Sequence, residues 1–239
     1  MTTSQAALHS KSSISRSLGE WLRENWFGIF LVLYGAWIFA PFFAPLFMKM
    51  GWNAAGKAIY FTYSFFCHQL PERSIFLFGP KRMYSLGEIQ AVWQNIYNPL
   101  LLRQFIGNEA MGWKVAWSDR MISFYTSFWV FAVAWWPLRR IIRPVSWFGF
   151  VFLLLPIALD GGSHMFSDLA GLGHGFRDTN HWLAVVTGST LPAWFYAGDA
   201  LGSFNSWARL VSGLFAGLAL AWLVFPLMLQ TMSPDTESP

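Results

Sequence analysis

The sequence predicts an all-α polytopic membrane protein with four transmembrane helices plus one or two re-entrant or interfacial half-helices. Of its 239 residues, 55% are hydrophobic and only 12% are charged, whereas a soluble domain carries about 25% charged residues. Its 15 Trp residues suit the membrane–water interface, where the apolar and polar parts of an indole are both satisfied. This composition excludes a soluble enzyme. It also argues against nucleic acid as a partner, which a net charge of +4 would suggest on a soluble protein. The predicted partner is the lipid bilayer of a cell membrane.

Four apolar segments approach the length of about 20 residues that a helix needs to cross the hydrocarbon core. The predicted spans are residues 26–48, 121–138, 145–160 and 206–229. The second span is followed directly by Arg139 and Arg140, the third is short and ends on Asp160, and the fourth contains Arg209 near its start.

Two further segments are ambiguous. Residues 54–66 are apolar but too short to cross alone, and residues 181–197 are interrupted by small polar residues and a proline. We expect re-entrant or interfacial helices there, because irregular backbone at membrane depth must be buried in protein or line a polar cavity. The polar ends, residues 1–20 and 230–239, are expected to be disordered and leave a single membrane domain over residues 21–229.

Basic residues predict the orientation. Arg139, Arg140 and Arg143 lie in a very short loop, which the positive-inside rule places in the cytoplasm together with both termini. Residues 49–120 and 160–205 would then lie outside. The first of these segments is itself rich in Lys and Arg, but long segments cross the membrane largely regardless of charge.

The most unusual polar stretch is residues 67–74, which read Cys-His-Gln-Leu-Pro-Glu-Arg-Ser between two apolar regions. Polar groups at membrane depth are costly unless they are partnered. One interpretation is a ligand or metal site. The other, somewhat favoured, is a hydrogen-bonded break between two half-helices, with Glu72 and Arg73 facing the lipid headgroups.

A second cluster begins where the third span was predicted to end. Gly161 and Gly162 predict a turn that brings the carboxylate of Asp160 to the imidazole of His164. Such a pair suits a metal ion or acid–base chemistry, whereas a capped helix end is the plain alternative. Arg209 lies inside a predicted span and therefore needs a carboxylate partner. The predicted partner is Asp160. Arg120, at the start of the second span, also needs a carboxylate partner, and Asp119 lies beside it in the sequence.

These observations predict one polar pocket at the outer leaflet. Its predicted residues are Cys67, His68, Gln69, Glu72, Arg73, Arg120, Asp160, His164 and Arg209. A divalent metal ion is one candidate ligand, with His68, His164 and Asp160 as its ligands. No HxxxH, CxxC or HExxH spacing supports such a site, however.

The stretch 67–74 resembles the signature C-H-Q-x-P-x-R-S of a family of uncharacterised bacterial and archaeal integral membrane proteins, a domain of unknown function. Three later elements of that family have counterparts here. Residues 118–120 resemble its C-x-R element with Ser118 for Cys, residues 160–164 resemble D-G-x-x-Q with His164 for Gln, and residues 209–213 match R-x-x-[ST]-G. The resemblance implies no activity, but it implies that the four elements form one site. Ser118 puts a paired-thiol role in doubt.

Three functions are compatible with this pattern. The first is a binding or transport-related membrane protein that takes a small polar, ionic or metal ligand in the pocket. The second is a membrane enzyme that acts on an anionic or lipid substrate, with histidine as acid–base and arginines holding the anionic group. The third is a structural subunit of a membrane complex, in which the polar cluster only locks helices together and partner membrane subunits are expected.

Overall fold

A computed structural model describes residues 3–232, and four of its helices are long and apolar enough to cross a membrane. The first crossing segment, Leu18–Lys49, combines most of α1 (Thr3–Phe39), the 3-10 turn η1 (Ala40–Phe42) and α2 (Phe43–Lys49). The other three are α6 (Asp119–Leu138), α7 (Trp147–Asp168) and α11 (Phe204–Met232). The predicted fold class, an all-α polytopic membrane protein, is confirmed.

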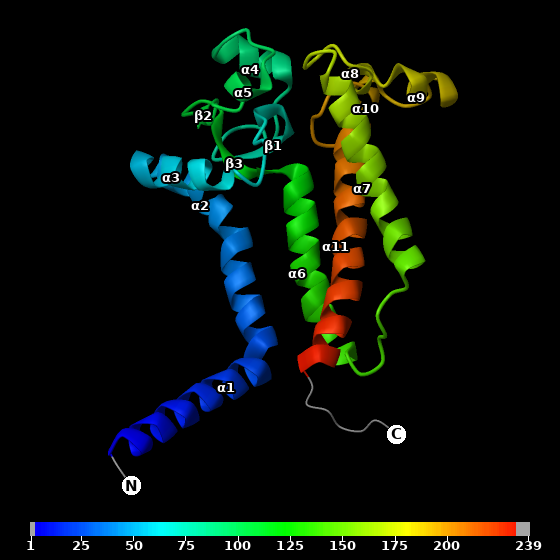
Figure 1. Ribbon diagram of the computed structural model, residues 1–239. Helices are drawn as coiled ribbons and strands as arrows, with labels where there is room; N and C mark the ends of the chain where they lie inside the picture. Colours follow the sequence, from blue (N-terminus) through cyan, green and yellow to red (C-terminus); the bar gives the residue numbers. More distant parts are fainter. Residues whose placement is uncertain (1–2, 233–239) are drawn as a thin grey trace.

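The predicted ends of the chain differ from the structure. Residues 1–20 were expected to be disordered, yet α1 begins at Thr3, and its N-terminal part bends away from the other helices in Figure 1. At the other end α11 continues to Met232. Residues 1–2 and 233–239 lie outside the described residues.

The predicted end of the third span was also wrong. The helix α7 does not stop at Asp160 but continues through Gly161 and Gly162 to Asp168. Glycine weakens a helix interior but does not forbid one. Beyond the glycines, Met165 and Phe166 are exposed apolar side chains while His164 is buried, so the amphipathic pattern of a helix continues.

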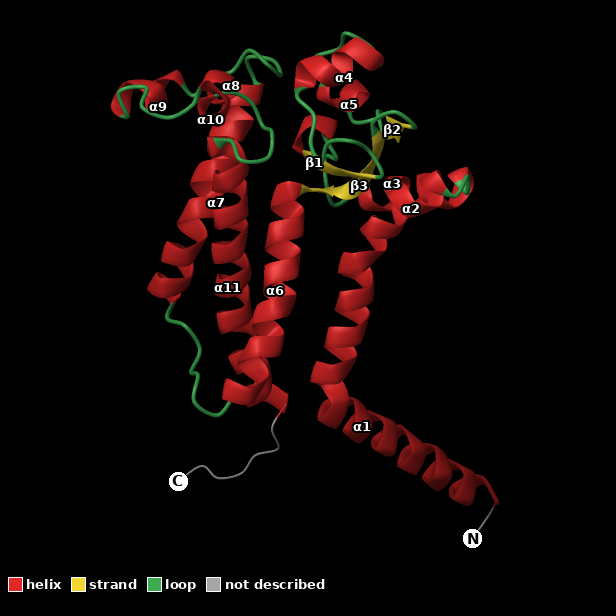
Figure 2. Cartoon of the chain, turned by 180° about the vertical axis from the view of Figure 1, so that it is seen from behind, coloured by secondary structure: helices red, strands yellow, loops and turns green. Residues whose placement is uncertain are grey.

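α11 packs against both α6 and α7, and the three helices lie side by side in Figures 1 and 2. Gly213 and Gly217 allow the close approach of α11 to α6. A Cβ on Gly213 would lie 2.7 Å from Ser123 Oγ, and one on Gly217 would lie 2.0 Å from Ser127 Oγ. Small residues four apart are a usual device for close helix contact in membranes.

The chain between α2 and α6 forms a folded head at one end of the bundle (Figure 1). It contains the predicted short helix as α3 (Asn53–Tyr63), followed by the 3-10 turn η2 (Pro71–Arg73) and the helices α4 (Leu86–Val92) and α5 (Pro99–Leu102). It also contains a small antiparallel sheet that the sequence did not predict. The strands are β1 (Ser74–Leu77), β2 (Gly107–Asn108) and β3 (Gly112–Ser118), in the order β1-β3-β2.

The connection between α7 and α11 lies at the same end of the bundle as the head (Figures 1 and 2). It carries α8 (Phe176–Thr179), α9 (His181–Val186) and α10 (Ala193–Tyr196). The segment 181–197 is therefore two short helices and no span. Because β3 runs directly into α6, the head, this connection and the ends of the long helices meet in one region.

Candidate functional site

Buried charge is concentrated where the head meets the bundle. Four arginines and four aspartates form two sets of ion pairs, which we together call the ion-pair network. Its members are Arg73, Arg120, Arg177, Arg209, Asp119, Asp160, Asp168 and Asp199. They come from η2, α6, α7, α8, α11 and the chain before α11. Hydrogen bonds join the two sets: the Arg120 backbone N–H donates to Asp119 Oδ1, and the Ser212 hydroxyl lies within hydrogen-bond distance of Asp160 Oδ2 and of the Arg209 carbonyl. The network therefore joins segments that are far apart in the sequence.

Asp160 is the centre of one half of the network, the Asp160 cluster. Its Oδ2 accepts from Arg120 Nη2 at 2.8 Å and its Oδ1 accepts from Arg177 Nη2 at 2.8 Å. Ser212 Oγ donates to Oδ2 at 3.2 Å. The carboxylate is only 6% exposed, so its charge is compensated by arginines from two different elements, as a buried charge requires.

His164 completes the Asp160 cluster. Its Nε2 lies 3.1 Å from Arg177 Nη2 and 3.6 Å from Asp160 Oδ1. A guanidinium can only donate, so Nε2 accepts from Arg177 and the ring proton of a neutral imidazole is on Nδ1. The sequence predicted that Asp160 and His164 are close, but the reason is different. They lie one turn apart on the same face of α7, and no turn forms at the two glycines.

Asp199 is the centre of the other half, the Asp199 cluster. Arg209 Nη1 donates to Asp199 Oδ1 at 2.5 Å, and Arg73 Nε donates to Oδ2 at 3.0 Å. Arg73 also makes a bidentate contact with Asp168, with both N–O distances 2.8 Å. Burial alone would raise the pKa of Asp199, but the guanidiniums of Arg73 and Arg209 outweigh it and hold that pKa well below its usual value.

The predicted partner of Arg209 was wrong. Its Nε donates to both carboxylate oxygens of Asp119 at 2.8 Å, and its remaining donors go to Asp199. Asp160 pairs instead with Arg120 and Arg177. Arg209 is 1% exposed, so two carboxylates compensate a fully buried guanidinium.

Residues of the stretch 67–74 have different roles. Cys67 is buried, and its Sγ lies 3.4 Å from Ser118 Oγ and accepts from the Ser118 backbone N–H at 3.3 Å. Gln69 is buried and donates to the carbonyl of Tyr60. These residues hold the head against the start of α6, whereas Arg73 enters the network.

His68 is exposed. No hydrogen bond or ion pair joins it to the other predicted pocket residues within the part of the chain that the structure describes. Glu72 is buried at 4% exposure, and neither carboxylate oxygen has a partner among the described residues. Burial raises the pKa of Glu72 to about 7. Among the predicted pocket residues, Arg73, Arg120, Asp160 and Arg209 therefore belong to the ion-pair network, and His164 contacts it.

The predicted metal site is not supported. Within residues 3–232, no group of three or more His, Cys, Asp or Glu side chains is arranged to hold a metal ion. The proposed ligands explain this. His68 is exposed, His164 faces Arg177, and the carboxylate of Asp160 is occupied by guanidiniums.

Sequence reasoning missed Arg177, Asp168 and Asp199 as pocket residues, and it named Asp119 only as the neighbour of Arg120. No motif marks them, but the charge balance was a usable signal. The predicted pocket held three arginines against Asp160 and Glu72, and buried guanidiniums require nearby carboxylates. Acidic residues predicted to lie at that end, among them Asp168 and Asp199, were therefore candidates.

The fold and these buried charges define an integral membrane protein with four membrane-crossing helices. No protein-family model matches the chain, and no solved structure matches it. The chain is similar to an uncharacterised protein of Methanocaldococcus jannaschii, with 24% identity over 163 residues. That alignment covers 68% of this chain and 82% of the archaeal protein.

Proposed function

We propose that this integral membrane protein binds a small anionic ligand, one that presents carboxylate or phosphate oxygens, at the Asp160 cluster. Charge distribution supports the proposal. In this cluster two guanidiniums, of Arg120 and Arg177, share the single carboxylate of Asp160. In the Asp199 cluster two guanidiniums contact three carboxylates. The four guanidiniums and four carboxylates of the network balance overall, but guanidiniums are in local excess at the Asp160 cluster, and this local excess favours an anion there.

The observation that carries the proposal is the set of unused donors in the same cluster. Arg120 Nε, Arg177 Nε and His164 Nδ1 are buried and have no hydrogen-bond partner among the described residues. All three carry an N–H, the imidazole one because Nε2 already accepts from Arg177. Buried donors without partners are costly. A ligand with several acceptor oxygens would satisfy them and also compensate the local excess of positive charge.

The contacts also support the proposal that the chain belongs to the family whose signature it resembles. The four elements that resemble those of the family contact one another in space, each with the next. Cys67 of the first contacts Ser118 of the second, and Arg120 of the second contacts Asp160 of the third. Asp160 in turn contacts Ser212 of the fourth element. If the chain belongs to this family, an alignment of the family should show that these contacting pairs are conserved.

Thermal unfolding of the full-length protein in detergent tests the binding proposal. Phosphate and acetate are each added and compared with chloride at equal ionic strength. A ligand that binds only the folded state raises Tm with concentration, so we expect at least one of the two anions to raise Tm more than chloride. The variant R177K keeps the charge beside Asp160 but lacks the Nε donor, and it should lose most of that rise. The exposed R82K is the matched control and should keep it.

A purely structural role for the cluster is the competing function. The neighbouring Asp199 cluster favours this structural role for the Asp160 cluster. Its ion pairs connect η2, α6, α7 and α11 without an excess of positive charge, so ion pairs at this end already hold elements together. If R177K lowers Tm while neither phosphate nor acetate shifts the wild-type protein beyond chloride, the binding proposal is wrong and the structural role is preferred. A full anion-dependent rise in R177K would also contradict binding at this cluster.

A further inference from the structure

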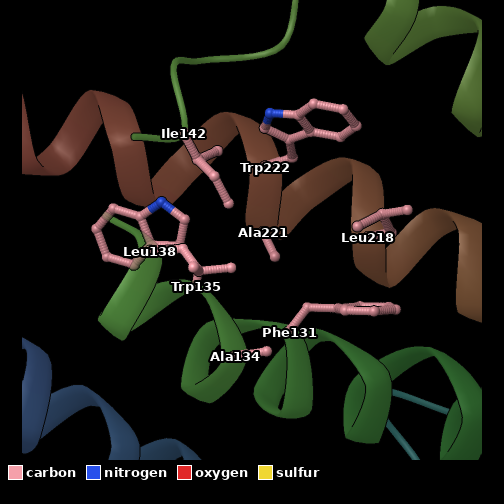
Figure 3. A pocket seen from close by; sticks show the side chains of 8 residues that line it. All are labelled: Phe131, Ala134, Trp135, Leu138, Ile142, Leu218, Ala221 and Trp222. Atoms are coloured by element: carbon pink, nitrogen blue, oxygen red, sulfur yellow. The ribbon is translucent and has the colours of Figure 1, made fainter. Parts of the chain in front are cut away.

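The opposite end of the bundle carries an apolar groove next to a group of arginines. The groove has a volume of about 260 Å³ and lies between the ends of α6 and α11 (Figure 3). All its lining side chains are apolar, and they include Trp135 and Leu138 of α6, Ile142 of the following loop, and Ala221 and Trp222 of α11. A complete small-molecule site has a volume of about 300–1,000 Å³, so this groove suits part of an elongated apolar molecule.

The loop that closes the groove is held in place by α11. The indole N–H of Trp222 donates to the Arg143 carbonyl at 2.9 Å, and the Val145 N–H donates to the Trp222 carbonyl. These bonds place Arg140 and Arg143 on either side of Ile142, which lines the groove. Both arginines are exposed, and their guanidiniums have no hydrogen-bond or ion-pair partner within residues 3–232.

A third observation comes from Trp135, which is 4% exposed. Its indole nitrogen has no hydrogen-bond partner among the described residues. In Figure 3 this nitrogen is on the side of the ring that faces Ile142, toward the arginine loop. A buried N–H at this position requires an acceptor, because the surrounding hydrocarbon offers none.

We propose that this groove is a binding site for one anionic phospholipid. An acyl chain occupies the apolar groove, the phosphate lies between Arg140 and Arg143, and an ester or phosphate oxygen accepts from the indole of Trp135. Charge complementarity selects this occupant. A partner helix would fill the groove but would leave two unpaired arginines at the interface, whereas an anionic headgroup compensates them. Basic pockets between membrane helices are a recognised setting for such headgroups.

Arg139 is not part of the phosphate site. Its Nη1 donates to the Trp136 carbonyl at 2.7 Å, and its guanidinium lies 4.1 Å from the centre of the Trp136 ring. That stacking stabilises the end of α6. The selective charge is therefore expected to come from Arg140 and Arg143.

Lipid retention by the purified full-length protein tests the site. The protein in detergent is incubated with phosphatidylglycerol or with phosphatidylcholine of the same acyl chains, and bound lipid is counted by native mass spectrometry. We expect one retained phosphatidylglycerol, with a preference over phosphatidylcholine of at least about tenfold. The double variant R140Q/R143Q should lose this preference, since each basic residue near an anionic lipid contributes about that order of discrimination.

Matched variants separate the site from general effects. K57Q/R82Q removes two exposed charges from the other end of the molecule and should keep the preference. A134W fills the groove from an exposed position and should abolish retention of the lipid, whereas V133W adds the same side chain at an exposed position that does not line the groove. Equal retention of both lipids by the wild type, an unchanged preference in R140Q/R143Q, or equal retention by A134W and V133W would each overturn the proposal. The result is independent of anion binding at the Asp160 cluster.

Discussion

Glu72 and Lys114 are buried charged groups of the head outside the network. The Lys114 ammonium donates to the carbonyls of Gln69 and Arg103, and burial lowers its pKa to about 7. Burial also raises the pKa of Glu72 to about 7, although Arg73 and Lys114 oppose the shift and Asp199 reinforces it. In the unfolded chain the Glu72 carboxyl titrates near its ordinary value of 4.5.

The raised pKa of Glu72 predicts a pH-dependent stability. Between pH 4.5 and about 7 the folded protein retains a proton that the unfolded chain has released. The free energy of unfolding therefore falls as the pH rises through this window, by an amount on the order of 3 kcal/mol. The variant E72Q is always neutral, so its advantage in Tm over the wild type should grow from pH 5 to pH 7. Parallel curves of Tm against pH for the two proteins would show that Glu72 does not titrate in this way.

The exposed Glu109, changed to Gln, is the control, and its Tm should follow that of the wild type at each pH.

Residue types in the network could be predicted from the sequence, but their pairing could not. The cost of a charge inside a span indicated that Arg209 requires a carboxylate. Asp119, Asp160 and Asp199 were all acceptable on that ground. The choice between them depends on which face of α6, α7 and α11 each residue occupies, and Arg177 became available to Asp160 only through the fold of the connection before α11.

At the scale of elements, the contact between α6 and α11 is set by Gly213 and Gly217. Small residues spaced four apart in a membrane helix, like these two glycines, indicate a face that packs closely against another helix. Opposite them, Ser123 Oγ donates to the Leu210 carbonyl at 2.6 Å, and Ser127 Oγ donates to the Gly213 carbonyl at 3.3 Å. Such side chain–backbone bonds require that the two helix backbones stay close.

Substitution of Gly217 should therefore separate the two helices. A Cβ there would lie 2.7 Å from the backbone nitrogen of Phe128 as well as against Ser127, so a helix must move. We expect G217A to cost about 1–3 kcal/mol, the usual range for overpacking, and to lower Tm in detergent. The matched control is G28A in α1, where an added Cβ meets nothing within 4 Å. That change should be neutral or slightly stabilising, because alanine favours a helix. Equal Tm values for G217A and G28A would contradict the close contact.

Element boundaries were harder to predict than element positions. A Gly-Gly pair after an apolar run is typical of a turn, which led to the predicted end at Asp160. Burial of Asp160, His164 and Ser167 on one face of α7 outweighs that local preference. The short strands of the head were not predicted, because their burial also depends on tertiary contacts and not on a local pattern. β1 has only four residues, and β3 is buried on both faces along most of its length, so neither strand shows a readable alternation of polar and apolar residues in the sequence.

At the scale of the whole molecule, charge is segregated between two ends. The head, the connection between α7 and α11 and the ion-pair network occupy one end, while the loop with Arg139, Arg140 and Arg143 occupies the other (Figure 1). Apolar periodicity and the run of arginines were sufficient to predict this arrangement, because membrane crossing and topology depend on local hydrophobicity and loop charge. Contacts between distant loops carry no such local signal.

Accessibility of introduced cysteines tests this segregation together with the orientation that the arginine loop predicts. Cys67 is the sole cysteine of the chain and is buried, so the wild type should resist an impermeant maleimide in right-side-out membrane vesicles. S189C, at an exposed position in the connection between α9 and α10, should react without permeabilisation. I141C, whose side chain is 78% exposed in the arginine loop, should react only after permeabilisation, since that loop is expected in the cytoplasm. Reaction of both variants in sealed vesicles would contradict placement of the two segments on opposite faces. Reaction of I141C alone would instead reverse the predicted orientation.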